Sequence, residues 1–368
     1  MPAIQAKIVG DFCNLRCTYC RDRDFDQKGK RVMAPQVLRA LIHSLSQLPQ
    51  SIQRIHWLGG EPTLAGLDFF KEVVRLQQEC VGKRWVNTIQ TNATTINRKW
   101  AEFFKAHDFK VGVSVDGTSQ THDADRINLA GRGSYTKVMS GVRILREEGI
   151  YPSVICVVTK KNADAGALML RSLVGSGFTS IAFNAFYNTA TNLSSDPFAV
   201  SDKAWTQFLI DIFEEWVMLD RADVQVRELD NMIAWTQGRV AHSCVFRGSC
   251  STWMLVDYDG KTYPCERLGR PMSFGDITSV LSFSEILRAD AYREFTSQTL
   301  RLPEMCKVCP MQAFCHNGCV AHRVDDGDTS PHYAYCGSRL AFYDYLKKHV
   351  GAISVAAPAM SAPSILGN

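Results

Sequence analysis

Three cysteines near the start of the chain, Cys13, Cys17 and Cys20, have the spacing of ligands to one metal cluster. Their C-x3-C-x2-C pattern supplies thiolates, the soft sulfur ligands that iron–sulfur clusters require. A [4Fe–4S] cluster held by three thiolates keeps one iron open to a substrate or cofactor. The triplet therefore predicts a catalytic centre, whereas a closed set of four ligands would indicate a structural one. Taken alone, the triplet also fits three free cysteines or part of a zinc site.

A second group of cysteines lies in the C-terminal part of the chain and is large enough to hold two further clusters. Two sets of four thiols match the ligand number of two fully coordinated [4Fe–4S] clusters. Four cysteine thiolates also bind zinc in a tetrahedral site, so a pair of zinc sites is the competing interpretation. The group comprises Cys244, Cys250, Cys265, Cys306, Cys309, Cys315, Cys319 and Cys336.

The composition of the chain restricts its partners and its compartment. The 368 residues carry a formal net charge of +4 without a concentrated Lys/Arg run, so nothing in the sequence indicates nucleic acid as a partner. No apolar stretch approaches the roughly 20 residues that span a bilayer, and the N-terminus lacks the layout of a secretory signal. We therefore expect a cytoplasmic protein without a membrane partner, whose thirteen cysteines serve as metal ligands rather than as disulfides.

Short β-branched runs alternate with helical stretches over the first half of the chain. This alternation predicts βαβ units around a parallel sheet, with the working loops at the C-terminal ends of the strands. The units are too few for a closed eight-fold barrel, so the α/β fold is a partial (β/α)6 barrel or an open doubly wound sheet. The cysteine triplet follows the first strand, where such a loop lies. The strands are expected at 4–9, 54–58, 86–90, 110–115, 153–158 and 180–183, and the helices at 35–48, 67–80, 97–107, 135–148 and 163–175.

The rest of the chain changes character along its length. A strongly amphipathic helix is expected at 202–219, and a helix at 338–350 ends a stretch rich in cysteine and glycine. The last residues are rich in Ala, Ser and Pro, which predicts a disordered tail. The expected parts are therefore an α/β domain at 1–190, a helical connection at 191–240, a cysteine-rich domain at 241–350 and a tail at 351–368.

The run Gly59-Gly60-Glu61-Pro62 follows the second expected strand. Two glycines let a backbone pass close to a ligand, and a carboxylate at a strand end can accept hydrogen bonds from an ammonium group. An ordinary turn is the competing interpretation of this run on its own. Its place one βα unit after the cysteine triplet favours a binding role.

Together, these motifs resemble those of radical S-adenosylmethionine (SAM) enzymes. The run Gly59–Leu67 is similar to the peptide-modifying branch of that superfamily, which carries a C-terminal SPASM domain. The resemblance implies that the open iron chelates the amine and carboxylate of SAM. It also implies SAM contacts from the loops after successive strands, namely Tyr19, Gly59, Gly60, Glu61, Pro62, Asn92, Ser114 and Arg126.

The cysteine-rich part resembles the seven-cysteine SPASM signature, which would give the chain three [4Fe–4S] clusters in total. The resemblance implies that the ligands of the two auxiliary clusters interleave along the chain. The two cysteines left over are Cys80, on an apolar helix face, and Cys156, inside a strand, and we expect both to be buried core thiols. One auxiliary cluster would take Cys244, Cys250, Cys265 and Cys319, and the other Cys306, Cys309, Cys315 and Cys336.

The family resemblance also implies a reaction. An electron from the first cluster breaks a C–S bond of SAM and leaves methionine and a 5′-deoxyadenosyl radical, which abstracts hydrogen from the substrate. Oxidation of the substrate radical to product then returns an electron and releases a proton, so a base near the substrate is expected. The electron donor would be a small redox protein such as flavodoxin or ferredoxin.

Over its length the chain resembles anaerobic sulfatase-maturating enzymes, which oxidise Cys or Ser to formylglycine. Those enzymes have Asp after the third SPASM cysteine, Phe-Tyr after the triplet and Gln before the two glycines; this chain has Glu266, Arg21-Asp22 and Leu58. These departures favour a different substrate. Our first hypothesis is therefore a maturase that forms an oxidative cross-link, such as a cyclophane, in a ribosomally made precursor peptide. Formylglycine formation is the alternative, and an iron–sulfur or zinc scaffold that binds a partner peptide is the non-enzymatic one.

Glu266 and Asp22 are the candidates for the catalytic base, and each is equally an ion-pair partner for a neighbouring arginine. Because the strands begin near residue 4, we expect no N-terminal winged-helix domain for binding a leader peptide. Any leader would then be recognised by the barrel, by the SPASM region or by a separate protein.

Overall fold

The computed structural model describes residues 2–21, 31–186, 196–248, 250–270, 272–279, 282–324 and 331–356. The chain divides into two compact units, each made from separate stretches of sequence. Unit 1 consists of residues 1–114, 126–152 and 250–298, and unit 2 of residues 115–125, 153–249 and 299–368.

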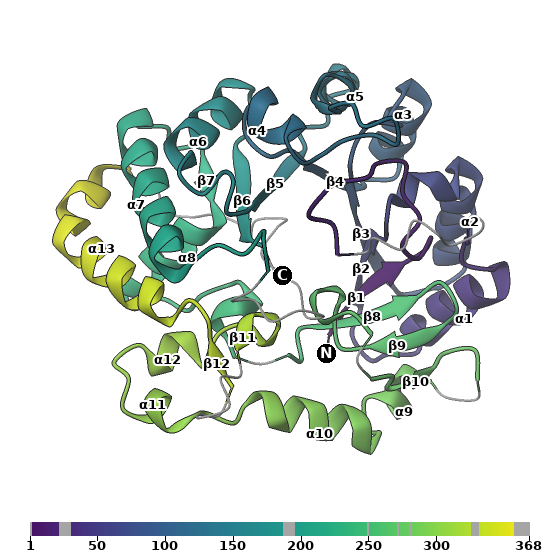
Figure 1. The fold of residues 1–368 in the computed structure, drawn as a ribbon. Coiled ribbons are helices and arrows are strands. Elements are labelled where there is room, and N and C mark those ends of the chain that lie inside the picture. Colours follow the sequence, from purple (N-terminus) through teal and green to yellow (C-terminus); the bar gives the residue numbers. More distant parts are fainter. Residues whose placement is uncertain are drawn as a thin grey trace. The chain divides into compact units, whose positions relative to one another are not determined.

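The strands of the described chain are short and are spread over its whole length (Figure 1). They are β1 (Ala3–Lys7), β2 (Ile52–Leu58), β3 (Arg84–Thr91), β4 (Lys110–Ser114), β5 (Ser153–Val158), β6 (Ser180–Ala185), β7 (Gln225–Val226), β8 (Trp253–Asp257), β9 (Lys261–Tyr263), β10 (Gly275–Asp276), β11 (Arg323–Val324) and β12 (His332–Tyr333).

The α-helices are α1 (Pro35–Ser46), α2 (Leu67–Gln78), α3 (Arg98–Ala106), α4 (Ser119–Asp123), α5 (Tyr135–Glu147), α6 (Gly166–Gly175), α7 (Asp202–Leu219), α8 (Arg227–Thr236), α9 (Phe283–Ile286), α10 (Asp290–Thr299), α11 (Glu304–Lys307), α12 (Gln312–Cys315) and α13 (Cys336–Ala356). The short 3-10 helices are η1 (Pro62–Ala65), η3 (Cys244–Phe246), η4 (Glu266–Leu268) and η5 (Val320–His322).

Unit 1 is built on a sheet with the strand order β10-β9-β8-β1-β2-β3-β4. Strands β1 to β4 are parallel, as the βαβ pattern predicts. On its other side β1 pairs in parallel with β8, with Ala3 opposite Trp253 and Lys7 opposite Asp257. The first strand of the cysteine-rich part therefore continues the sheet of the N-terminal part, and the expected boundary near residue 240 does not separate these strands.

The two faces of the unit 1 sheet differ in character. Helices α1, α2, α3 and α5 cover one face (Figure 1), where Trp57 of β2 packs edge-on against Phe70 of α2 at a ring distance of 5.8 Å. Because side chains alternate along a strand, neighbouring positions of β1, β2 and β3 present Gln5, His56 and Thr88 together on the other face. That second face is polar and lies on the side where the chemistry predicted from the sequence would be placed.

Unit 2 contains the parallel strands β5, β6 and β7, covered by long helices. Phe183 of β6 meets Phe208 of α7 at 5.1 Å, and Phe213 of α7 meets Phe342 of α13 at 6.3 Å. Ser201 caps α7 by accepting a hydrogen bond from the backbone N–H of Ala204. The aromatic residues on the apolar side of α7, the amphipathic helix expected at 202–219, therefore belong to the hydrophobic core.

The expected strands and helices of the α/β half all form, with ends that differ by a few residues. Cys156 is buried in β5, as predicted. The prediction for Cys80 is wrong, because α2 ends at Gln78 and the Cys80 thiol is half-exposed. The last helix runs six residues past the predicted end at 350, to Ala356.

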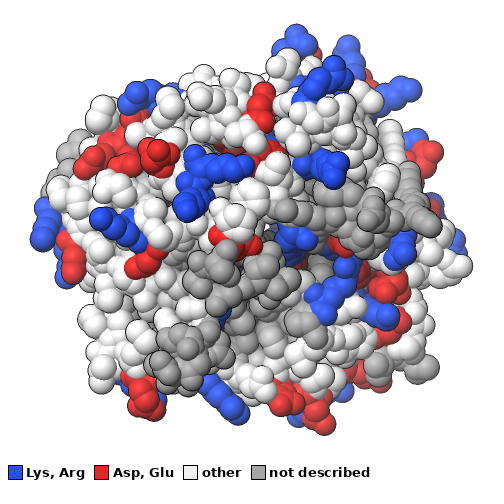
Figure 2. Space-filling model, in the orientation of Figure 1, with Lys and Arg blue, Asp and Glu red and all other residues white. Residues whose placement is uncertain are grey.

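The surface and the helices agree with the charge and hydropathy of the sequence. On the face shown in Figure 2, acidic and basic side chains are interspersed. Within the described ranges, no helix is long and apolar enough to cross a membrane.

Candidate functional site

The loop that follows β1 carries Cys13, Cys17 and Cys20 close together. The backbone N–H of Cys20 donates to the carbonyl of Cys17 at 3.1 Å, which closes a turn around the last two thiols. Burial, together with the nearby Glu61, Cys17 and Cys20, raises the pKa of Cys13 to about 12. A thiol of this kind is protonated without metal and loses its proton when a metal binds. The geometry fits a three-thiolate cluster site.

The loop after β2 supports the cysteine loop through its backbone. The N–H groups of Gly60 and Glu61 donate to the carbonyls of Gly10 and Phe12, each at 2.9 Å. A Cβ on Gly60 would lie 2.1 Å from the carbonyl oxygen of Phe12, so only glycine lets the two backbones meet here. The backbone of Gly60 and Glu61 therefore holds the segment that leads directly into Cys13.

The carboxylate of Glu61 is fully buried and is occupied by protein donors. It accepts hydrogen bonds from the Thr63 hydroxyl at 2.6 Å, the Thr91 hydroxyl at 2.7 Å and the Asn92 backbone N–H at 2.6 Å. Burial raises the pKa of Glu61, while these hydrogen bonds act in the opposite direction. The side chain thus ties the loop after β2 to the end of β3, and its contact with SAM stays a prediction together with that of Pro62.

The end of β3 also contacts the cysteine loop. The Asn92 amide donates to Asn14 at 2.9 Å and approaches the sulfur of Cys13 at 3.7 Å. On the next strand, Ser114 accepts a hydrogen bond from Gln90 at 3.0 Å. Among the described residues, the other polar atom of Gln90, Oε1, is buried without a partner and is available to accept from a bound cofactor. The contacts of Asn92 and Ser114 with SAM stay predictions.

Tyr19 and Arg126 contact each other in unit 1. The guanidinium carbon of Arg126 lies 5.5 Å from the centre of the Tyr19 ring, which is a cation–π arrangement. The segment is held against the cysteine loop because the N–H of Arg16 donates to the carbonyl of Ile127 at 2.7 Å. Both residues predicted to touch SAM thus lie beside the loop that would hold the cluster.

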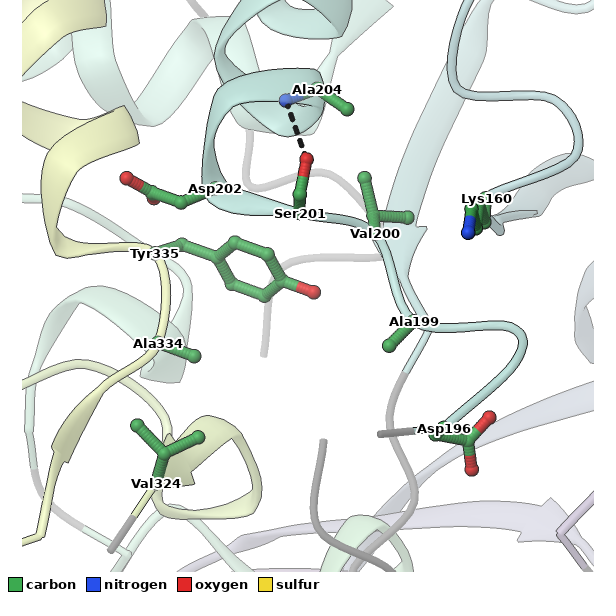
Figure 3. Close-up of a pocket in the computed structure, with 10 residues that line it drawn as sticks. All are labelled: Lys160, Asp196, Ala199, Val200, Ser201, Asp202, Ala204, Val324, Ala334 and Tyr335. Atoms are coloured by element: carbon green, nitrogen blue, oxygen red, sulfur yellow. Dashed lines mark hydrogen bonds between the residues drawn. The ribbon is translucent and has the colours of Figure 1, made fainter. Parts of the chain in front are cut away.

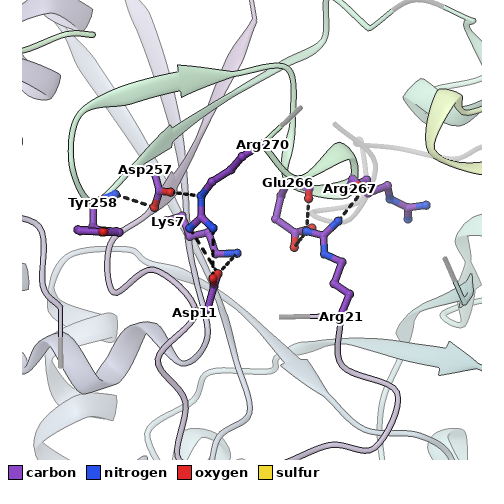
Figure 4. A network of polar contacts seen from close by, with 8 residues as sticks. All are labelled: Lys7, Asp11, Arg21, Asp257, Tyr258, Glu266, Arg267 and Arg270. Carbon is purple, nitrogen blue, oxygen red and sulfur yellow. Dashed lines mark hydrogen bonds and ion pairs between the residues drawn. The ribbon is translucent and has the colours of Figure 1, made fainter. Parts of the chain in front are cut away.

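Glu266 is bound to Arg21 (Figure 4). The Arg21 guanidinium donates to the Glu266 carboxylate and to the carbonyl oxygens of Glu266 and Arg267, while the Arg267 side chain extends away from the pair. The backbone N–H of Glu266 donates to Gln5 at 2.8 Å. Two of the departures found in the sequence therefore meet in the structure. Asp22, the other candidate base, lies outside the described residues.

The Glu266 side chain is near His56, a half-buried histidine that the sequence analysis did not single out. His56 lies on the polar face of β2 and makes a 2.6 Å hydrogen bond with the hydroxyl of Thr88. Burial lowers the pKa of His56 to about 4, and the negative charge of Glu266 opposes this shift. The imidazole is therefore neutral at pH 7. The alternation of β2 places it on the polar face, and only strand pairing shows that this face is shared with Gln5.

A second polar network, also missed from the sequence, joins the cysteine loop to β8 (Figure 4). Lys7 binds Asp11 at 2.6 Å, and Arg270 binds both Asp11 and Asp257. Burial alone would raise the pKa of Asp11, but Lys7 and Arg270 outweigh it and hold this pKa below its usual value. A lysine inside the apolar run of β1 was the available signal in the sequence.

Replacing Lys7 by Met is expected to destabilise unit 1 by about 3 kcal/mol, because it leaves two buried carboxylates to share Arg270. Thermal unfolding followed by circular dichroism measures this change. The control is Lys71→Met, which removes an exposed ion pair with Asp68 and should cost less than about 1 kcal/mol. Equal losses in the two variants would mean that the network does not stabilise the fold.

Four of the predicted cluster ligands come together within unit 2. Burial raises the pKa of Cys336 to about 12, and the neighbouring Cys315, Cys306 and Cys309 add to this effect. Burial also raises the pKa of Cys306, with Cys315 and Cys309 again contributing. This is the set that the SPASM resemblance assigns to one auxiliary cluster. Their role as ligands stays a prediction.

The other predicted set is divided between the units. Cys244 begins η3 and Cys319 precedes η5 in unit 2, whereas Cys250 and Cys265 precede β8 and η4 in unit 1. Between Cys315 and Cys319, three consecutive residues have left-handed backbones, and the side chain of Asn317 holds this turn by bonds to Pro331 and Tyr333. Such a turn lets two cysteines of one C-x3-C run point to different ligand sets.

No three His, Cys, Asp or Glu side chains of the described ranges converge tightly enough to hold a single metal ion.

Unit 2 also contains a cavity of about 530 Å³ (Figure 3). Its wall includes the small apolar side chains of Ala199, Val200 and Ala334, and the Tyr335 ring projects into it. Among the residues that the structure describes, the buried Tyr335 hydroxyl has no hydrogen-bond partner, so it is available to donate to a ligand in the cavity.

Comparison of the sequence with known protein families identifies the domains of this chain. Residues 7–168 match the radical SAM superfamily, and residues 244–310 match the SPASM iron–sulfur cluster-binding domain. The chain is a radical SAM enzyme with a SPASM domain. Its fold is accordingly the mixed α/β radical SAM fold followed by that domain, as the sequence predicted. The two domains indicate iron–sulfur clusters and SAM as the cofactors of this radical SAM enzyme.

This radical SAM protein is similar to sulfatase-maturating enzymes over most of its length. It is 29% identical to a cysteine-type anaerobic sulfatase-maturating enzyme of Clostridium novyi, over 83% of this chain and 84% of the relative. It is 27% identical to a serine-type enzyme of Bacteroides thetaiotaomicron, over 94% of this chain and 91% of the relative.

Solved structures show the same likeness. The structure of anSMEcpe with bound AdoMet and the Cp18Cys peptide matches 97% of this chain and 99% of its own, with a TM-score of 0.87 and 26% identity. The structure of SuiB from Streptococcus suis bound to its precursor peptide SuiA matches 92% of this chain and 76% of its own, with a TM-score of 0.66. At 13% identity, that second match shows a shared fold only.

Proposed function

We propose that this enzyme oxidises a side chain of a peptide substrate. The observation that supports this most strongly is the full-length match to a sulfatase-maturating enzyme whose structure holds both AdoMet and a peptide. The relatives named above act on cysteine or serine. Conversion of a peptide Cys or Ser to formylglycine is therefore the first reaction to test, ahead of the cross-linking that the sequence departures favoured.

In this proposal, different residues of the chain hold the first cluster, the cofactor and the peptide. When bound, the first cluster and SAM supply a 5′-deoxyadenosyl radical, while the protein orients the reactants and excludes side reactions. The backbone of Gly60 holds the cysteine loop, and the unpartnered oxygen of Gln90 is available to the cofactor. Tyr335 offers a hydrogen bond to the peptide at the cavity of unit 2. The auxiliary clusters would accept the electron released on product formation, and a flavodoxin or ferredoxin would supply the first one.

A second candidate is oxidative cross-linking of a precursor peptide, and the Arg21–Glu266 pair favours it. In the resemblance described above, an aromatic pair follows the triplet and an aspartate stands in place of Glu266. Here a guanidinium binds the carboxylate directly, so the carboxylate at this position is held as an ion pair. A pocket changed at both partners is suited to a different substrate side chain.

The test is anaerobic incubation of the reconstituted enzyme, SAM and reductant with two synthetic peptides, the Cp18Cys peptide and its serine counterpart, followed by mass spectrometry. An aldehyde that reacts with hydroxylamine supports formylglycine formation. In a parallel arm, the enzyme is co-expressed with each short peptide that a neighbouring gene is found to encode. Loss of two hydrogens there without an aldehyde supports a cross-link. If every peptide stays unmodified while SAM is cleaved, peptide oxidation is not the function.

Glu266→Gln is expected to lower product formation by about 10²- to 10⁴-fold, the usual contribution of a general base. Formation of 5′-deoxyadenosine should persist, because the base acts after hydrogen abstraction. The matched control is Arg267→Met, since that side chain extends away from the pair and should leave product formation within about twofold. If Glu266→Gln retains full product yield, Glu266 is a structural partner of Arg21 and another group takes the proton.

A further inference from the structure

Arg339 is a buried cation in the first turns of α13. It is 5% exposed, and its guanidinium carbon lies 4.2 Å from the centre of the Tyr333 ring and 4.4 Å from that of Phe246. The planar group is therefore stacked between two aromatic faces, each of which favours a cation by its quadrupole. This arrangement fixes the position and the plane of the guanidinium.

The hydrogen bonds of Arg339 point to a thiol and to backbone carbonyls. Nη1 donates to the sulfur of Cys315 at 2.9 Å, and Nη2 donates to the carbonyl of Val245 at 2.7 Å. In the part of the chain that the structure describes, no Asp or Glu side chain forms an ion pair with Arg339, and the ionisable groups that act on it are Tyr333 and Cys315. A buried guanidinium without a counter-charge is strongly unfavourable, so an anion is expected at its contact.

The thiols provide that anion once they bind a cluster. Cys315 lies with Cys306, Cys309 and Cys336 in the group described above. Cluster ligands must be deprotonated, and a [4Fe–4S] centre held by four thiolates carries net negative charge. Neutral thiols alone would leave the Arg339 charge without compensation.

We propose that Arg339 is the counter-charge of the auxiliary cluster held by Cys306, Cys309, Cys315 and Cys336, and that it raises the reduction potential of this cluster. This inference rests on the proposed function, which includes auxiliary clusters, and on the ligand set that the SPASM resemblance assigns to one of them. Hydrogen bonds to the sulfurs and nearby charge set the potential of an iron–sulfur cluster. Reduction adds one negative charge, so a fixed cation 2.9 Å from a ligand sulfur stabilises the reduced form more than the oxidised form.

The test is a redox titration of the whole protein followed by electron paramagnetic resonance. The background carries Cys13, Cys17 and Cys20 replaced by Ala, so that only the two auxiliary clusters give signals. In Arg339→Gln, one of the two midpoint potentials should fall. At a fixed applied potential, the ratio of reduced to oxidised cluster should be about tenfold lower, which corresponds to a shift of about 59 mV for a one-electron couple. The second midpoint should stay in place.

Two further variants keep the test decisive. Arg171→Gln removes an arginine of unit 2 whose side chain is 58% exposed and is paired with Glu215. Neither midpoint potential should change in this variant. Arg339→Lys keeps the charge but cannot reach both Cys315 and Val245, so the same midpoint should fall by a smaller, few-fold ratio. If Arg339→Gln binds no cluster at Cys306, Cys309, Cys315 and Cys336, the midpoint potential of Arg339→Lys tests the role of Arg339 instead.

The role of Arg339 would be refuted if both midpoint potentials stayed unchanged in an Arg339→Gln variant that holds all its clusters. Where Arg339→Gln does not bind the cluster, unchanged midpoint potentials in Arg339→Lys would refute it. Either result would leave the proposed function intact. A different failure concerns the ligand set itself. The background protein should hold about eight irons, two four-iron clusters, and Cys306→Ala should remove about half of them. If Cys306→Ala leaves the iron content unchanged, the assigned ligand set and this inference are both wrong, whatever peptide the enzyme modifies.

Discussion

Replacing Cys13, Cys17 and Cys20 together by Ala is expected to reduce 5′-deoxyadenosine formation to the background of a sample without iron. The structure places these thiols in one loop behind β1, and the loss of all three leaves no protein ligand at that place. The variant should also bind about four fewer irons, the content of one [4Fe–4S] cluster. The product is measured by chromatography after anaerobic incubation with SAM and reductant.

The matched control is Cys80→Ala, which removes a half-exposed thiol in the same unit that donates to the backbone carbonyl of Leu76. It should keep both the iron content and the yield of 5′-deoxyadenosine. Undiminished SAM cleavage in the triple variant would refute a catalytic cluster at this loop. That result would favour the alternative hypothesis, in which the chain is a non-enzymatic scaffold that binds a partner peptide.

Gly60→Ala is expected to reduce SAM cleavage nearly as far as the loss of the ligands, although residue 60 binds no metal. A methyl group there would lie 2.1 Å from the Phe12 carbonyl oxygen and 2.6 Å from that of Asp11, both in the backbone that leads into Cys13. Since backbone cannot rotate away as a side chain can, the cysteine loop must shift. We expect at least about 2 kcal/mol of destabilisation and incomplete loading of the first cluster. Iron analysis and the 5′-deoxyadenosine assay measure both effects.

Gly175→Ala serves as the control for a glycine-to-alanine change. Gly175 ends α6, and a Cβ there meets no other atom within 4 Å. Alanine favours the helix over glycine, so this variant should be as stable as the parent or slightly more stable. If Gly60→Ala loads and cleaves SAM like Gly175→Ala, the close approach of the two loops is not required for the cluster.

The two predictions separate the thiols from the backbone that positions them. The first tests ligand chemistry, which the cysteine spacing indicates directly. The second tests a contact between residues 12 and 60, which no local pattern contains. A similar distinction applies to Glu266, whose partner Arg21 lies 245 residues away along the chain.

Much of the fold could be predicted because its signals are local. Strands β2 to β6 and their helices follow from alternating β-branched and amphipathic runs. The helix α8 and the helix α10 were not expected, since they lie in parts of the sequence with weak periodicity and are fixed by packing. The expected division of the chain near residue 240 stays a prediction, but the strand pairing across it could not be predicted from the sequence. The pairing of β8 with β1 joins strands about 250 residues apart, and hydrophobic patterning does not specify which strands pair.

By itself, the sequence determined the chemistry that this protein can perform. Ligand atoms are a property of residue type and spacing, so eleven of the thirteen cysteines already indicated metal clusters. The use of SAM and the count of three clusters came from the family resemblance, and the count stays a prediction. Only the tertiary structure decided what surrounds those atoms. It placed Gly60 against Phe12, Arg21 on Glu266 and Arg339 on Cys315. These contacts join distant stretches of chain, and their energies depend on burial and on approach distances that exist only after folding.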